Sequence, residues 1–174
     1  DSFFQAQETI QSSLALLDTG ATVSLGTVCS LTLTQRQRLK QTGGKDDGVI
    51  WYDTSHKKKF KFGNAGTKQG LGQTAFLIWF DDEEADLPLQ VMETGSILVP
   101  TLIGMDFMVR EDVIIFAALN CVIWRNRCPD RFVQLRGCPG GHMLVNLQED
   151  FLTQFGWATT TPLPDQLSSR VVND

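Results

Sequence analysis

Short runs of β-branched and aromatic residues, separated by turn formers, dominate the apolar pattern of the chain. The clearest runs are residues 74–80, 97–103, 113–116 and 121–124. Short runs of this kind, bounded by turn signals, are typical of β-strands. Residues 73–80 are apolar on both alternating faces, which predicts an interior strand covered on both sides. The pattern as a whole therefore predicts a mainly β protein.

A lysine-rich segment leads into a glycine-rich one. Lys57, Lys59 and Lys61 share one face of an extended segment. Phe60 and Phe62 share the other face, as expected for a half-solvated strand. The glycines that follow are Gly63, Gly66, Gly70 and Gly72. They predict a flexible hairpin that can lie close to another backbone.

Helical signals are few. Residues 34–41 form the best candidate, with Thr34 as the N-cap, basic side chains late in the segment and Gly43-Gly44 as the stop. A second short helix is expected after Gly104, over residues 106–110.

The chain has 174 residues, a length that suits one main domain. After Trp124 the sequence changes to Arg, Asn, Cys, Pro and Gly, and it ends in a Thr-Pro-Ser tail. We therefore expect a domain over residues 1–124 and an appendage, partly ordered at most, over residues 125–174. The first residue is Asp1 rather than Met, with no leader pattern, so we expect a fragment or an excised product.

Composition narrows the function classes. A hydrophobic fraction of 42% against 20% charged residues excludes a wholly disordered chain. The formal net charge of −5 opposes phosphate backbones and anionic lipid, so nucleic-acid binding is unlikely without a strong local patch. The longest unbroken apolar run, residues 113–119, is far shorter than the ~20 residues needed to cross a bilayer, so no membrane partner is expected.

The strongest chemical signal is Asp18-Thr19-Gly20, followed by Ala21, at the end of the apolar run 14–17. An Asp at a strand end, followed by a hydroxyl residue and Gly, lets the backbone turn sharply. Thr19 can then bond across to a symmetry mate, and the Gly20 carbonyl is left open to a ligand. The alternative is an ordinary surface turn after a core strand.

A second element, Leu102-Ile-Gly104-Met-Asp, follows later in the chain. In this order the two elements resemble those of the retropepsins, the single-domain aspartic proteases of retroviruses and LTR retrotransposons. The resemblance runs from about Ser12 to Trp124 and is closer to retrotransposon polyprotein members. Two further segments fail as a second catalytic motif: Asp53-Thr-Ser lacks the Gly, and Glu93-Thr-Gly has Glu in place of Asp.

The resemblance implies an all-β fold, a closed retropepsin-like barrel or sandwich with one or two short helices, that forms half of a two-fold symmetric dimer. Asp18 from two copies would share a proton, because two carboxylates so close cannot both ionise readily. The ionised one would act as general base on a water, and the protonated one would donate to the scissile carbonyl. Thr19 would lock the two loops together, and Gly20 would accept from the substrate backbone. No cofactor or metal is implied.

The same resemblance implies which residues contact an extended peptide. The substrate-binding candidates are Ala21, Val23, Gly63, Gly66, Leu102 and Gly104. Gly104 would let its loop pass close beneath the Asp18 turn. Residues 59–72 would form a flap that closes over the peptide and excludes water. We also expect the apolar side chains of Val23, Leu25 and Leu102 to line side-chain pockets, which would favour apolar residues beside the cut bond.

Thr22 and Met105 occupy positions where many viral members carry an acidic residue and an Arg that pair to support the dimer. That ion pair is absent here. From the two motifs in order, we expect a homodimeric aspartic endopeptidase that processes a retrotransposon polyprotein, in an intracellular, cytoplasmic particle by family resemblance. The alternative is a catalytically silent retropepsin-like module for dimerisation or peptide docking.

Other signals are weaker. The spacing of Cys128, Cys138 and His142 matches no zinc pattern, and a fourth ligand is missing, so a metal-binding interaction domain is a remote alternative. The lysines of residues 57–61 are most simply a solvated strand face, with RNA or an acidic substrate as the other interpretation.

Overall fold

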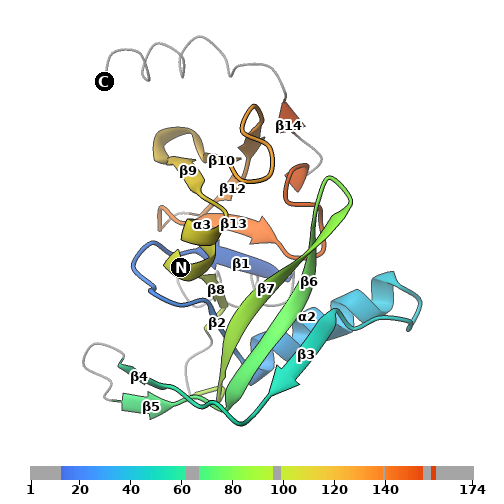
Figure 1. Cartoon of the computed structure of the whole chain (residues 1–174), viewed down its shortest axis with the longest axis vertical. Helices are drawn as coiled ribbons and strands as arrows, with labels where there is room; N and C mark the ends of the chain where they lie inside the picture. Colours follow the sequence, from blue (N-terminus) through green and yellow to red (C-terminus); the bar gives the residue numbers. More distant parts are fainter. Residues whose placement is uncertain (1–12, 62–66, 96–98, 139, 155–157, 160–174) are drawn as a thin grey trace.

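The computed structural model describes residues 13–61, 67–95, 99–138, 140–154 and 158–159 (Figure 1). The strands are β1 (Leu14–Leu17), β2 (Leu25–Thr27), β3 (Val49–Asp53), β4 (Lys59–Lys61), β5 (Thr67–Gln69), β6 (Gly72–Phe80), β7 (Glu83–Met92), β8 (Thr101–Ile103), β9 (Val113–Phe116), β10 (Cys121–Trp124), β11 (Phe132–Gln134), β12 (Arg136–Gly137), β13 (Met143–Asn146) and β14 (Ala158–Thr159). The helices are α2 (Val28–Gln41), α3 (Met105–Arg110) and the 3-10 helix η2 (Ala117–Leu119). The protein is therefore mainly β, as predicted.

The strands form one large sheet and two small ones. The large sheet has the order β12-β13-β1-β8-β2-β7-β6-β3, a second sheet has the order β14-β11-β10-β9, and β4 pairs with β5 alone. Strand β1 runs parallel to β8, and β2 runs parallel to β7. The large sheet has two different ends, β12 and β3, so the closed barrel we expected is wrong for the described residues. Strand β6 pairs with β7 on one side and β3 on the other, which confirms it as an interior strand.

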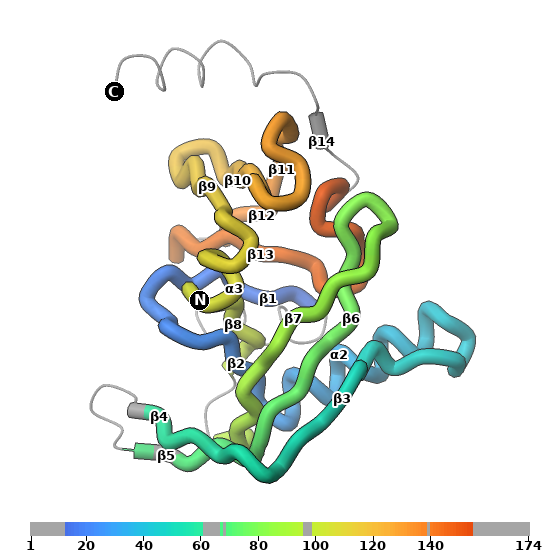
Figure 2. Tube along the Cα trace, viewed as in Figure 1, coloured from blue at the N-terminus to red at the C-terminus, as the bar shows by residue number. Residues whose placement is uncertain are grey.

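The expected boundary after Trp124 needs correction. Strand β13 pairs antiparallel with β1 along its whole length, and Figure 2 shows this late segment beside the first strand. Val145 and Phe151 are fully buried members of the main core. Residues 125–154 therefore belong largely to the same folded unit as the preceding chain. Composition had suggested an appendage because the turns that connect these strands are rich in Pro, Gly and Arg.

An aromatic cluster in the core joins residues from both sides of the expected boundary at Trp124. Trp124 lies 5.7 Å from Phe80, 5.9 Å from Phe107 and 5.5 Å from Phe151, measured between ring centroids. Such pairs contribute about 0.5–1.5 kcal/mol each beyond the burial of their area. Because Phe107 belongs to α3, the cluster fixes that short helix against the large sheet.

Helix α2 begins six residues earlier than predicted, at Val28 rather than Thr34. Thr27 is the N-cap: its side chain accepts from the Ser30 backbone N–H, and the Ser30 hydroxyl accepts from the Thr27 N–H in return. The expected N-cap, Thr34, lies inside the helix and donates to the Ser30 carbonyl. The sequence did not predict this start because the first residues of the helix are mainly apolar or β-branched. The predicted end at Gln41 and the short helix α3 after Gly104 are confirmed.

A buried arginine holds α2 against the sheet. Arg38 is 1% exposed and donates to the carbonyls of Leu77 in β6 and Leu147 after β13. Its guanidinium lies 4.5 Å from the centre of the Trp79 ring. Burial lowers the pKa of Arg38, and nearby Asp46 and Asp47 oppose that effect. No helix in the described residues is long and apolar enough to cross a membrane.

Candidate active site

The Asp18 turn begins where β1 ends. Three of the four residues of β1 are buried, and the strand lies between β8 and β13. The Asp18 backbone N–H donates to the Ile103 carbonyl of β8 at 2.9 Å. Its side-chain Oδ1 accepts from the Gly20 N–H at 2.9 Å. The buried strand thus delivers the carboxyl group to a tight, hydrogen-bonded turn, as the sequence predicted.

The apex of this turn faces solvent. Asp18 is half-buried, whereas Thr19 and Gly20 are exposed. A turn buried inside its own subunit could not meet a second copy. The observed exposure leaves the carboxyl group and the Thr19 hydroxyl open to another chain.

Gly104 lies directly against the backbone that follows the turn. A Cβ at Gly104 would lie 2.6 Å from the Val23 carbonyl and 2.8 Å from the Ala21 carbonyl oxygen. The next residue, Met105, donates its N–H to that Ala21 oxygen at 2.8 Å. The close passage expected for Gly104 is therefore present, and no larger residue fits there without moving backbone.

A serine and an aspartate tie the two loops together. Ser24 is fully buried, and both its N–H and its hydroxyl donate to Asp106 Oδ1, at 2.9 and 2.8 Å. The Ser24 hydroxyl also accepts from the Gly104 N–H at 2.9 Å. We call these three residues the loop clamp. The sequence analysis missed the clamp, although Asp106 had been noted within the second element.

Of the other predicted site residues, two lie near the crossing of the loops and two fall outside the described residues. Val23 and Leu102 are half-buried, and Leu102 pairs with Leu25 of β2 and Leu16 of β1. Val23 and Leu102 lie next to the point where the loop after Asp18 crosses the loop at Gly104. Gly63 and Gly66 lie outside the described residues, so only the base of the predicted flap, the β4–β5 hairpin, is seen.

Thr19 also borders a hollow of about 300 Å³ beside α3 and β9. The other lining residues are mainly apolar: Met105, Met108, Val109, Asp112, Val113 and Ile115. Val109 is 67% exposed, which is high for an apolar side chain. The exposed apex of the Asp18 turn therefore adjoins an apolar surface.

Asp53-Thr-Ser forms a similar turn in a different setting. Asp53 Oδ1 accepts from the Ser55 N–H at 2.8 Å and from the Ser55 hydroxyl. These bonds, with a smaller effect of His56, lower the pKa of Asp53. The turn follows β3, the edge strand of the large sheet.

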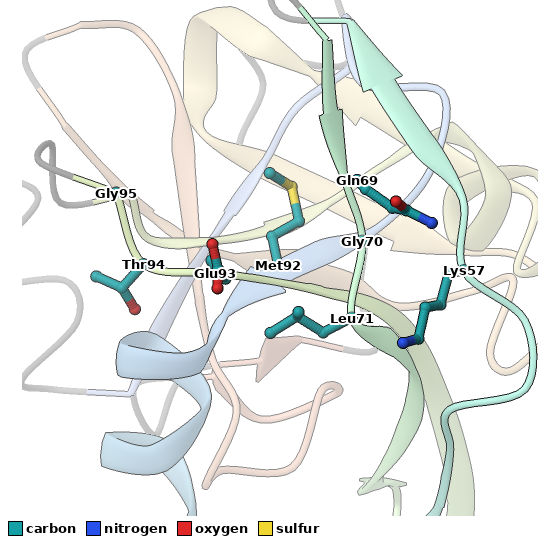
Figure 3. Close-up of a pocket in the computed structure, with 8 residues that line it drawn as sticks. All are labelled: Lys57, Gln69, Gly70, Leu71, Met92, Glu93, Thr94 and Gly95. Carbon is teal, nitrogen blue, oxygen red and sulfur yellow. The ribbon is translucent and has the colours of Figure 1, made fainter.

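Glu93-Thr-Gly, the other incomplete motif, lines a larger pocket at the base of the β4–β5 hairpin (Figure 3). The pocket has a volume of about 490 Å³ and is lined by Lys57, Gln69, Gly70, Leu71, Met92, Glu93, Thr94 and Gly95. Thr94 Oγ1 accepts from the Cys29 N–H near the start of α2 at 2.8 Å. This segment therefore forms a pocket wall, and Asp18 is not among the lining residues.

Comparisons with known proteins give a similarity to solved structures. No family model matches the chain, and no curated protein matches it. Among solved structures, the chain is similar to the retroviral protease-like domain of Ddi1 from Leishmania major, with a TM-score of 0.38 and 18% sequence identity. The match covers 63% of this chain and 75% of that one.

Proposed function

We propose that this protein is a retropepsin-type aspartic endopeptidase that acts as a homodimer on extended peptide segments and processes a retrotransposon polyprotein. One observation carries the proposal. The apex of the Asp18-Thr19-Gly20 turn is exposed at the end of a buried strand, and Gly104 lies directly against the backbone of Ala21 and Val23 that follows the turn. The paired motifs of the sequence are thus adjacent in space.

The chemistry requires two copies of Asp18. Two carboxyl groups brought close together hold one proton between them, because the second ionisation is opposed by the first charge. The ionised carboxylate takes a proton from a bound water as the water oxygen attacks the scissile carbonyl carbon. The protonated carboxyl donates to the carbonyl oxygen. The C–N bond then breaks as the amide nitrogen takes up the proton that the first carboxyl took from the water, while the second carboxylate regains a proton from a hydroxyl of the tetrahedral intermediate.

The loop clamp supports this arrangement within one chain. Ser24 and Asp106 fix the position of the loop that follows Asp18 without help from a partner. Because Thr22 and Met105 provide no ion pair, the dimer depends on the exposed turn and on the apolar hollow beside Thr19. We therefore expect weak association, with specific activity that rises with enzyme concentration.

The test compares Asp18→Asn with Asp53→Asn. Both aspartates accept the same N–H hydrogen bond from the residue two positions later, so the two variants make the same change in similar turns. Incubation with a peptide library at mildly acidic pH, at several enzyme concentrations, should show cleavage by wild type and Asp53→Asn. Asp18→Asn should lose about 10²–10⁴-fold in rate, the usual contribution of a general acid–base group.

Melting temperatures of both variants should match wild type. Cleavage retained by Asp18→Asn, or activity independent of concentration from a monomer in sedimentation, would overturn the proposal. Wild type that binds peptides without cutting them at any concentration would favour the silent docking module, which the missing dimer ion pair also supports.

A further inference from the structure

The charge of the chain is unevenly distributed. Residues 54–80 contain five of the fifteen Lys and Arg residues and none of the twenty Asp and Glu residues. The rest of the chain therefore holds ten basic and twenty acidic residues. All five lysines lie within residues 57–68, the segment of the β4–β5 hairpin. The hairpin segment is thus strongly positive, whereas the protein as a whole is acidic.

The lysines at the base of the hairpin are exposed and have no carboxylate partner in the described part of the chain. Lys57, Lys58 and Lys59 are all exposed, and none forms an ion pair with a described residue. Several arginines in the second half of the chain differ from these lysines, because they form ion pairs with carboxylates. They are Arg110, Arg125, Arg127 and Arg131. The lysine charges are therefore free to attract an anionic ligand.

Lys57 brings one of these charges to the large pocket. Figure 3 shows Lys57 and Gln69 on one side of the pocket and Glu93 and Thr94 on the other, with Leu71 and Met92 between them. The volume of about 490 Å³ is ample for peptide side chains. A carboxylate that enters here is attracted by Lys57 and repelled by Glu93, so the two residues have opposite effects on the same ligand.

We propose that the base of the hairpin selects acidic polypeptide segments. Lys57 is the specificity-determining residue, and Glu93 weakens the same preference because it repels a carboxylate. The inference rests on the proposed function for its catalytic readout. A pocket with room for peptide side chains fits a peptide carboxylate, whereas the surplus of acidic residues outside the hairpin repels a long phosphate backbone. Acidic peptide is therefore favoured over RNA.

The experiment uses two peptides with the same cut site, one carrying Glu and the other Gln at the flanking positions. Lys57→Gln should lower the Glu-to-Gln ratio of kcat/KM about two- to fivefold, the range of an exposed ion pair. Glu93→Gln should raise the ratio. Lys45→Gln is the matched control, since Lys45 is exposed and its loop between α2 and β3 lies on the opposite side of Figure 1 from the hairpin. High salt should reduce the wild-type preference.

Equal effects of Lys57→Gln and Lys45→Gln, or a ratio lowered by Glu93→Gln, would overturn the inference.

Binding of a fluorescent acidic peptide to Asp18→Asn separates this inference from the proposed function. If wild type cuts nothing but binding is lost in Lys57→Gln, the inference stands and the protease proposal fails. If wild type cuts both peptides equally, the inference alone fails. A single-stranded RNA that displaces the acidic peptide at equal concentration would assign the lysines to RNA and overturn it.

Discussion

Two turns of this protein share the same local chemistry and differ in what surrounds them. In each, an Asp is followed by Thr and a small residue, and the carboxylate accepts the N–H of the residue two positions later, at 2.9 Å for Asp18 and 2.8 Å for Asp53. The first turn follows β1, which lies between two strands, and the second follows the edge strand β3. Local sequence is therefore sufficient to form the turn.

The difference lies in a second segment of chain. The Asp18 turn is bonded to β8 through the Ile103 carbonyl, and its continuation is crossed by Gly104 and fixed by the loop clamp. The Asp53 carboxylate is instead held by its own neighbours, Ser55 and His56. A turn becomes a candidate catalytic centre when distant residues fix its position and leave its apex exposed.

The largest expected effect comes from Gly104→Ala. The new methyl group would meet backbone atoms of Ala21 and Val23 at 2.6–2.8 Å, which a side-chain rotation cannot relieve. We expect destabilisation of about 3 kcal/mol, near the upper end for overpacking, and loss of peptide cleavage. Thermal unfolding and the cleavage assay measure the two effects. Gly140→Ala is the matched control, because among the described residues a Cβ there would meet only the His142 ring, at 3.8 Å. Equal behaviour of the two variants would show that the crossing is not essential.

Asp106→Ala should have the next largest effect. It removes the acceptor for the buried N–H and hydroxyl of Ser24, and an unsatisfied buried donor costs about 1–3 kcal/mol. Denaturant unfolding should show a loss in this range, with reduced cleavage. Asp106→Asn keeps an oxygen acceptor, so it should retain more stability. Full activity in Asp106→Ala would mean that the clamp does not position the Asp18 turn.

The smallest effect is expected at the second turn. The Ser55 hydroxyl is the main cause of the lowered pKa of Asp53, so Ser55→Ala should raise that pKa toward its ordinary value. A lowered carboxyl pKa stabilises the fold above the ordinary pKa, and this contribution is lost as pH falls through the lowered one. The Asp53 side chain is 43% exposed, so solvent screens this contribution, and the melting temperature at neutral pH should fall only slightly. Peptide cleavage should not change. NMR titration of Asp53 measures the shift, and a change in cleavage would contradict the separation of the two turns.

Several features were predictable because they depend on nearby residues. The Asp18 turn, the interior strand at residues 73–80, the end of α2 and the short helix α3 follow from alternation, caps and glycines within a few positions. The close passage of Gly104 was expected from the family resemblance. Neither motif by itself predicts that the Gly104 loop crosses the loop after Asp18. The contribution of Thr19 and Asp18 to a dimer remains a prediction.

Other features depended on segments that are far apart in the sequence. The pairing of β13 with β1, the open order of the large sheet and the bond between Ser24 and Asp106 have no local pattern. The sequence by itself determined where the chain turns and which carboxyl stands at the turn, because backbone preferences and apolar alternation act over a few residues. Only the tertiary structure decided which strand lies beside β1 and which aspartate holds its loop, because burial of apolar area and buried hydrogen bonds join residues that are distant in the chain.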